Sequence, residues 1–87
     1  MNVIVESRFA VAPTPDILEL VPAEQPRGRE LHAQGIRQAL FIASDLSASW
    51  QVFDVESREE LDRALASLPP HPYMVETVTQ LTDSNQL

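Results

Sequence analysis

The sequence predicts an α+β domain in which strands and helices follow the order βαββαβ. Two segments alternate with the period of two that is typical of strands, two more are rich in β-branched and aromatic residues, and two segments have helical character. This order gives the ferredoxin-like arrangement, a four-stranded antiparallel sheet with both helices on one face. The predicted strands are residues 2–11, 36–43, 49–55 and 73–81, and the two helical segments end near residues 34 and 68.

The first predicted strand has two different faces. One face carries Val3, Val5 and Phe9, and the other carries Glu6 and Arg8. The segment APTPD, residues 12–16, ends this strand because proline has no amide hydrogen to give to a sheet. Thr14 or Asp16 in that segment is predicted to cap the helix that follows.

Two prolines interrupt the first helical segment. Pro22 and Pro26 each lack an amide hydrogen, so either a short helix over residues 16–21 precedes a second helix, or one helix is kinked. We favour a break near Pro22, with the main helix running to Gln34. Gly35 is then expected to end it in the left-handed conformation.

The C-terminal half combines a hairpin with the clearest helix signal. The short turn segment SDLSAS joins strands 36–43 and 49–55, which makes them antiparallel. Ser57 and Glu60 have the spacing of a capping box, ahead of one apolar stripe at helical spacing. That stripe is Leu61, Ala64, Leu65 and Leu68. The corner PPHP forbids further helix, and its His71 is expected to be exposed.

The composition excludes several classes of function. The chain has 87 residues, enough for one domain with a modest core, and no cysteine, so self-association is an expected source of stability. Its net charge of -7, with no lysine, opposes binding to nucleic acid or to an anionic membrane. No apolar run reaches signal-peptide or membrane-spanning length, so a cytoplasmic location is expected. No histidine pair has ligand spacing, and no metal site is expected.

One long segment resembles a known family. WQVFDVESREELDRALASLPPHPYM, residues 50–74, is similar to the muconolactone isomerase family in its VFDV strand, acidic helix and LP..PYM corner. The resemblance implies a cofactor-free enzyme that shifts a carbon-carbon double bond in an unsaturated lactone during the breakdown of aromatic compounds. It also implies a dimeric α/β barrel, assembled into rings of dimers up to a decamer, with a site built from more than one subunit.

The resemblance also implies candidate catalytic residues. Glu24, counted back from Gly35, matches a family glutamate and is the predicted base; the alternative is a solvated helix glutamate. Tyr73 and Trp50 stand where the family has aromatic residues, so they are candidates for the wall of a substrate pocket, and Tyr73 can also donate a hydrogen bond. For Trp50, packing at a dimer interface is the competing interpretation.

The sequence departs from the family at two places. Glu6 stands where the family has a lysine on the first strand, and Asp45 and Leu46 stand where it has a histidine in a turn. Both changes put an acid in place of a cation or proton donor, which predicts weaker stabilisation of a dienolate. The alternatives are therefore a cyclase, dehalogenase or oxygenase-like enzyme, or a non-catalytic oligomeric domain that binds a metabolite.

The remaining candidates each have two interpretations. Arg37 can bind a substrate carboxylate or be a strand-edge charge. Glu6 can act as a base or pair with Arg8 or Arg37 across the sheet. His32 can contact substrate, but its place at the end of a helix favours a structural role beside the helix dipole. Asp54 is expected to brace the helix that follows it.

Overall fold

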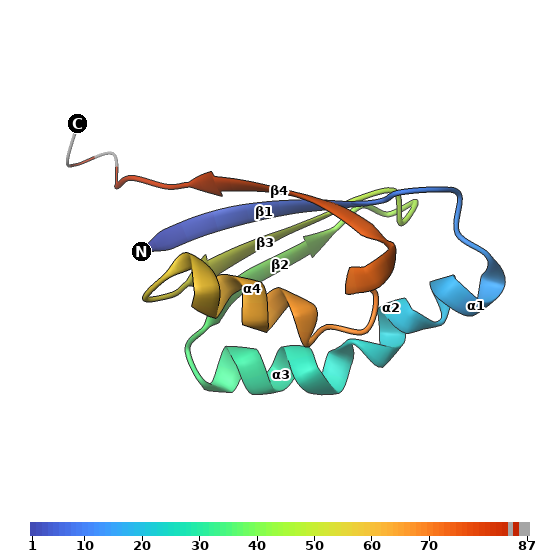
Figure 1. Ribbon diagram of the computed structural model, residues 1–87, viewed down its shortest axis with the longest axis horizontal. Helices are drawn as coiled ribbons and strands as arrows, with labels where there is room; N and C mark the ends of the chain where they lie inside the picture. Colours follow the sequence, from blue (N-terminus) through green and yellow to red (C-terminus); the bar gives the residue numbers. More distant parts are fainter. Residues whose placement is uncertain (84, 86–87) are drawn as a thin grey trace.

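The computed structural model describes residues 1–83 and 85 of the chain. Four strands form one antiparallel sheet in the order β2-β3-β1-β4, and the helices cover one of its faces (Figure 1). The strands are β1 (Asn2–Phe9), β2 (Arg37–Ile42), β3 (Ser49–Asp54) and β4 (Met74–Gln80). The helices are α1 (Pro15–Leu18), α2 (Leu20–Ala23), α3 (Gln25–Ala33) and α4 (Arg58–Ala66), with a 3-10 turn η1 (His71–Tyr73).

This arrangement confirms the predicted ferredoxin-like α+β fold. The sheet of the single chain is open rather than a closed barrel, with β2 and β4 at its opposite edges. The dimeric α/β barrel therefore stays a prediction. Of the predicted polar tail, residues 82–87, positions 84, 86 and 87 lie outside the described residues.

Several elements are shorter than predicted, because they end earlier or begin later. The last two predicted residues of α4 lie outside the helix. The Ser67 hydroxyl donates to the Ala64 carbonyl at 2.7 Å and so competes with the backbone hydrogen bonds that would extend it. Tyr73, predicted to begin the last strand, lies in η1 instead. Its amide donates to the Pro70 carbonyl at 3.0 Å, which closes this turn before β4 starts.

The first helical segment is interrupted at two glutamates rather than at Pro22. Glu19 and Glu24 separate α1, α2 and α3, and both keep right-handed helical dihedral angles. The second interruption lies between Pro22 and Pro26, where the missing Pro26 amide cannot donate to the preceding turn. Gly35, with φ of 75°, ends α3 in the predicted left-handed conformation.

The predicted caps are found with one difference. The Thr14 side chain accepts a hydrogen bond from the Ile17 amide at the start of α1, at 3.4 Å. Ser57 accepts from the Glu60 amide at 3.1 Å, while the Glu60 carboxylate accepts from the Glu56 amide at 3.2 Å, one residue before the position that a capping box requires. Asp54 does not brace α4: its carboxylate approaches the N-terminal amine at 3.5 Å.

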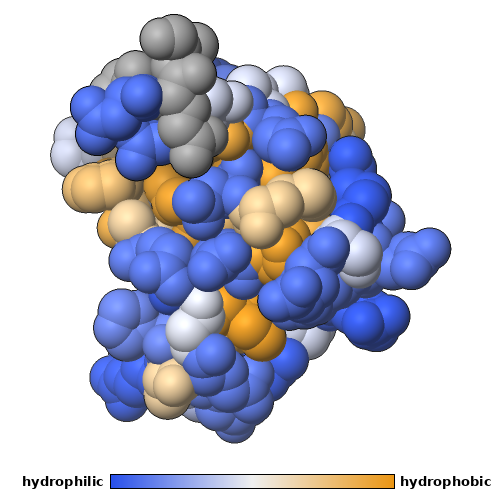
Figure 2. Space-filling view, turned by 90° about the vertical axis from the view of Figure 1, so that its left-hand side faces the viewer, coloured by the Kyte–Doolittle hydropathy of each residue, from blue (hydrophilic) through white to orange (hydrophobic). Residues whose placement is uncertain are grey.

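The two faces of the sheet differ in what covers them. The face toward the helices, here called the helix face, builds the core against α3 and α4. Its fully buried members are Val3, Val5 and Phe53, packed against Leu31 and Leu61. The opposite side, here called the open face, carries Ile4, Glu6, Arg8, Phe41, Trp50, Val52 and Val75. Figure 2 views the end of the molecule that holds both termini, where hydrophobic residues show between mostly hydrophilic ones.

Candidate active site

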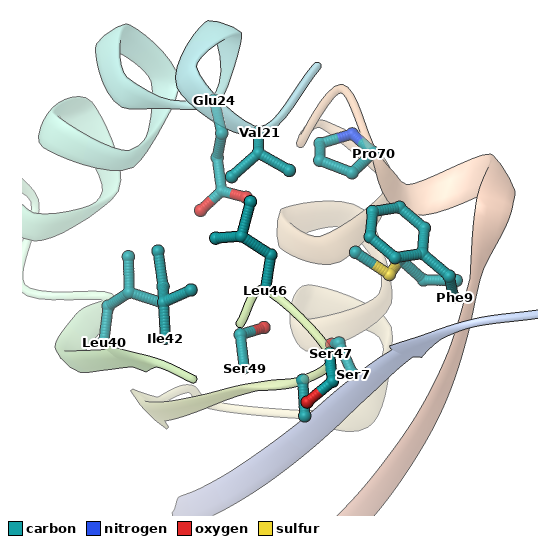
Figure 3. Close-up of a pocket in the computed structure, with 12 residues that line it drawn as sticks. Ser7, Phe9, Val21, Glu24, Leu40, Ile42, Leu46, Ser47, Ser49 and Pro70 are labelled. Atoms are coloured by element: carbon teal, nitrogen blue, oxygen red, sulfur yellow. The ribbon is translucent and has the colours of Figure 1, made fainter. Parts of the chain in front are cut away.

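A hollow lies between the helix face and the junction of α2 with α3. About 30 Å³ of it is open to the centres of water-sized molecules, far less than the roughly 300 to 1,000 Å³ of small-ligand sites, so in the single chain the hollow is small. Apolar side chains make most of its wall, among them Phe9, Val21, Leu40 and Leu46. The Glu24 carboxylate reaches from the helical side toward the sheet (Figure 3). We call this space the Glu24 hollow.

Arg37 holds Glu24 in place. Its Nη1 donates to Glu24 Oε1 at 2.8 Å and to Gln51 Oε1 at 3.0 Å. The Arg37 and Glu24 side chains are only 10% and 17% exposed, so the guanidinium balances the charge of a carboxylate that is mostly removed from water. Arg37 is thus neither an exposed edge charge nor free to bind a ligand through all its donors. It fixes the orientation of the predicted base.

Gly28 makes room for this ion pair. A Cβ atom at Gly28 would overlap the terminal nitrogens of Arg37. Glycine in the interior of a helix costs about 1 kcal/mol relative to alanine, so α3 gives up some stability at this position to seat the guanidinium. Neither Gly28 nor Gln51 was predicted as a site residue. The signals that point to them are a glycine inside a helical segment and an amide inside an apolar strand.

We expect the effect of Gly28→Ala on stability to change sign with the residue at position 37. With Arg37 present, the added methyl displaces the guanidinium and breaks two charged hydrogen bonds, so the free energy of unfolding falls by about 1 to 3 kcal/mol. In an Arg37→Ala background the same change should add about 1 kcal/mol through helix propensity. Urea denaturation of the four proteins measures both effects. The same sign in both backgrounds would contradict the proposed close packing.

A second, more polar pocket adjoins the hollow and shares Ser7, Ser49 and Glu24 with it. Ser7 on β1 pairs across the sheet with Ser49 and with Glu76, and all three line this pocket together with Glu24 and His71. His71 is half-buried rather than exposed, with Nδ1 2.8 Å from Glu76 Oε1. In the part of the chain that the structure describes, no group of three or more histidine, cysteine or carboxylate side chains could hold a metal ion.

Glu6 and Trp50 lie on the other side of the sheet. They pair directly between β1 and β3 on the open face, so the sheet separates them from Glu24 within one chain. Glu6 Oε1 accepts from Arg8 Nε at 2.7 Å, as one of the two predicted pairings requires. The other predicted partner, Arg37, pairs with Glu24 instead. The structure therefore does not bring Glu6 and Trp50 together with the predicted base.

The last three candidates do not line the Glu24 hollow. Tyr73 is an exposed residue of η1. The His32 Nδ1 lies 3.1 Å from the Arg37 carbonyl, which ties the end of α3 to β2. Asp45 lies in the exposed turn between β2 and β3, where hydrogen bonds from the hydroxyl and amide of Ser47 lower the pKa of its carboxyl. Leu46, beside it, has φ of 63° and lines the mouth of the hollow.

The fold agrees with the family that the sequence matches. The family model described as muconolactone delta-isomerase matches residues 5–86. The chain belongs to the muconolactone delta-isomerase family. Muconolactone Delta-isomerase of Acinetobacter baylyi is 34% identical to this family member over 62 residues, which are 71% of the present chain. The matched region spans 65% of the Acinetobacter protein.

Solved structures show the same fold for this muconolactone delta-isomerase family member. A crystal structure of muconolactone isomerase superposes with a TM-score of 0.76 at 29% identity, covering 95% of this chain and 90% of the other. The 5-chloro-2-hydroxyhydroquinone dehydrochlorinase of Burkholderia phenoliruptrix superposes with a TM-score of 0.81 but only 12% identity, covering 99% and 98%. The second likeness shows a shared fold alone. None of the helices in the described residues is long and apolar enough to cross a membrane.

Proposed function

We propose that this protein is a cofactor-free isomerase that shifts a carbon-carbon double bond in an unsaturated lactone, with Glu24 as the base. One observation carries the proposal: a mostly buried carboxylate, at the position of a family glutamate, reaches into a small, largely apolar hollow. A carboxylate in such a place can take a proton from carbon and return it. Family membership makes muconolactone the first substrate to test.

The proposed reaction moves one proton between two carbons. Glu24 removes a proton from the saturated γ carbon, which is attached to the far end of the conjugated double bond. The electron pair of the broken C–H bond forms the new double bond between the γ and β carbons, the pair of the original double bond shifts to the bond between the α carbon and the carbonyl carbon, and negative charge moves to the carbonyl oxygen to give a dienolate. Return of the proton to the carbon beside the carbonyl restores the C=O bond and leaves Glu24 ionised. The apolar wall of the hollow excludes water from this exchange.

We also propose that the active form is a homo-oligomer, at least a dimer and possibly a decamer, formed through the open face. Phe41 and Val75 on that face are 66% and 58% exposed, which leaves apolar surface that a second copy can cover. In such an assembly Trp50 and Glu6 reach a substrate only across a subunit boundary. Light scattering after gel filtration tests this proposal, and a monomer at micromolar concentration would contradict it.

An ultraviolet assay with muconolactone tests the proposed reaction. We expect conversion to the enol-lactone at a rate proportional to protein concentration. No conversion by protein that is folded and oligomeric would refute this substrate. A thermal-shift panel of lactones and aromatic acids then detects a metabolite-binding domain, because a ligand at 100 times its dissociation constant adds about 2.7 kcal/mol of stability.

A further inference from the structure

We propose that His71, positioned by Glu76, is a second catalytic residue of the Glu24 hollow, where its Nε2 donates a hydrogen bond to the carbonyl oxygen of the substrate as negative charge develops there. This inference rests on the proposed isomerase function and adds the group that stabilises its dienolate. Four features of the structure support it: the pairing of His71 with Glu76, their place in the hollow, their rigid attachment and the local charge balance.

The His71 ring is oriented by Glu76. Nδ1 lies 2.8 Å from Glu76 Oε1, although the angle falls outside hydrogen-bond geometry, so this buried nitrogen has no hydrogen-bond partner among the described residues. The His71 side chain as a whole is 34% exposed, and the Glu76 side chain 16%. Because Nδ1 itself is buried, the exposed surface of the ring belongs to its other atoms. Nε2 is the nitrogen left for a ligand.

His71 and Glu24 line the same polar pocket. That pocket, which Glu76 also lines, shares Ser7, Met74 and Glu24 with the larger hollow. Glu24 enters from the junction of α2 and α3, whereas His71 and Glu76 belong to η1 and β4. Pro70, directly before His71, lies across the hollow from Leu40 (Figure 3). A ligand in the polar pocket would therefore have both Glu24 and His71 as neighbours.

Rigid elements hold both members of the pair. His71 stands between two prolines, and its amide donates to the Leu68 carbonyl at 3.0 Å. Glu76 is part of β4 and pairs in register with Ser7 of β1. A donor fixed in this way needs little reorganisation as charge develops on the substrate, which is the condition for effective transition-state stabilisation.

A positive charge at His71 would complete the charge balance around the hollow. Glu24 and Glu76 each bring a negative charge and Arg37 brings one positive charge, so with a neutral imidazole the described groups carry one excess negative charge. An imidazolium balances it and offers Nε2–H to the dienolate oxygen. The hydrogen bond strengthens while the oxygen is negative and weakens when the carbonyl re-forms. No proton is transferred to the oxygen, so Glu24 remains the only group that exchanges one with carbon.

His71→Gln is expected to lower kcat for muconolactone roughly 100-fold, as loss of an oxyanion donor does, with KM within a few fold of its original value. Glu76→Gln removes the carboxylate that lies beside Nδ1, so it should also lower kcat, by a smaller factor, with KM again changed little.

Glu59→Gln, on the exposed side of α4, is the matched control and should leave kcat and KM unchanged. Unchanged kcat in His71→Gln would overturn the proposal. So would a change confined to KM.

Binding of 2,4-dinitrophenolate, a planar oxyanion that stays ionised near pH 6, tests the donor without turnover. We expect the protein to bind it near pH 6, followed by absorbance, and His71→Gln to lose at least tenfold in affinity while Glu59→Gln does not. No binding, or equal affinity in His71→Gln, would overturn the donor role even if the protein isomerises lactones. Binding through His71 without lactone turnover would instead refute the proposed substrate and leave the donor in place.

Discussion

Replacing Glu24 by glutamine is expected to reduce turnover of muconolactone by about 10² to 10⁴-fold, the usual contribution of a general base. Glutamine has nearly the same shape, and its amide oxygen can still accept the bond from Arg37 Nη1. What it cannot do is take a proton from carbon. The expected loss is therefore in kcat, with KM changed little, because the hollow and its apolar wall remain. Ultraviolet assays at several substrate concentrations measure both constants.

Glu19→Gln is the control for this substitution. Glu19 lies in the same helical segment, between α1 and α2, but is exposed and does not line the hollow. It should retain full activity. If Glu24→Gln also retained full activity, another group would have to be the base. If it raised KM and left kcat unchanged, Glu24 would be assigned to substrate binding.

The fold was predictable because its signals are local. Alternation along each strand, the stripe of Leu61, Ala64 and Leu65, and the cap at Ser57 each depend on residues close together in the chain. The positive φ of Gly35 is a local signal of the same kind. The ends of the elements were less predictable, because side-chain bonds such as that of Ser67 compete with the helix ladder.

The site was predictable only in part, because it depends on contacts between distant residues. Glu24 was found by resemblance, and Arg37 was a candidate, but their pairing across 13 positions of sequence has no local signal. The pairing of His71 with Glu76 depends on how η1 meets β4, so the sequence suggested an exposed histidine. The period of two put Glu6 and Phe9 on opposite faces, yet it did not say which face the substrate would use.

Arg37→Met is expected to lower the free energy of unfolding by about 3 to 5 kcal/mol, the usual cost of removing one partner of a buried ion pair. The change leaves the Glu24 carboxylate mostly buried without its cation and removes a donor from Gln51. Urea denaturation measures the effect. Because the pair is shielded from solvent, the loss should persist at high salt.

Arg58→Met is the matched control for a surface pair. The Arg58 and Asp62 side chains are 62% and 59% exposed, and Arg58 Nε lies 2.9 Å from Asp62 Oδ1. Such pairs within a helix contribute about 0.3 to 0.5 kcal/mol. If the free energy of unfolding of Arg37→Met were no lower than that of Arg58→Met, water would have to hydrate the Glu24 carboxylate once its partner is removed. In that case the hollow would be wetter than its apolar wall indicates.

The double variant Glu24→Met/Arg37→Met separates stability from function at this site. Replacing both partners of a buried pair by apolar side chains of similar volume is often neutral or stabilising, so we expect most of the loss from Arg37→Met to be recovered. Turnover should not recover, because the base is absent. A stable but inactive double variant would show that folding does not require this pair, which is then retained for its chemistry. A double variant as unstable as Arg37→Met would show instead that the pair, with its bond to Gln51, is part of what holds β2 against α3.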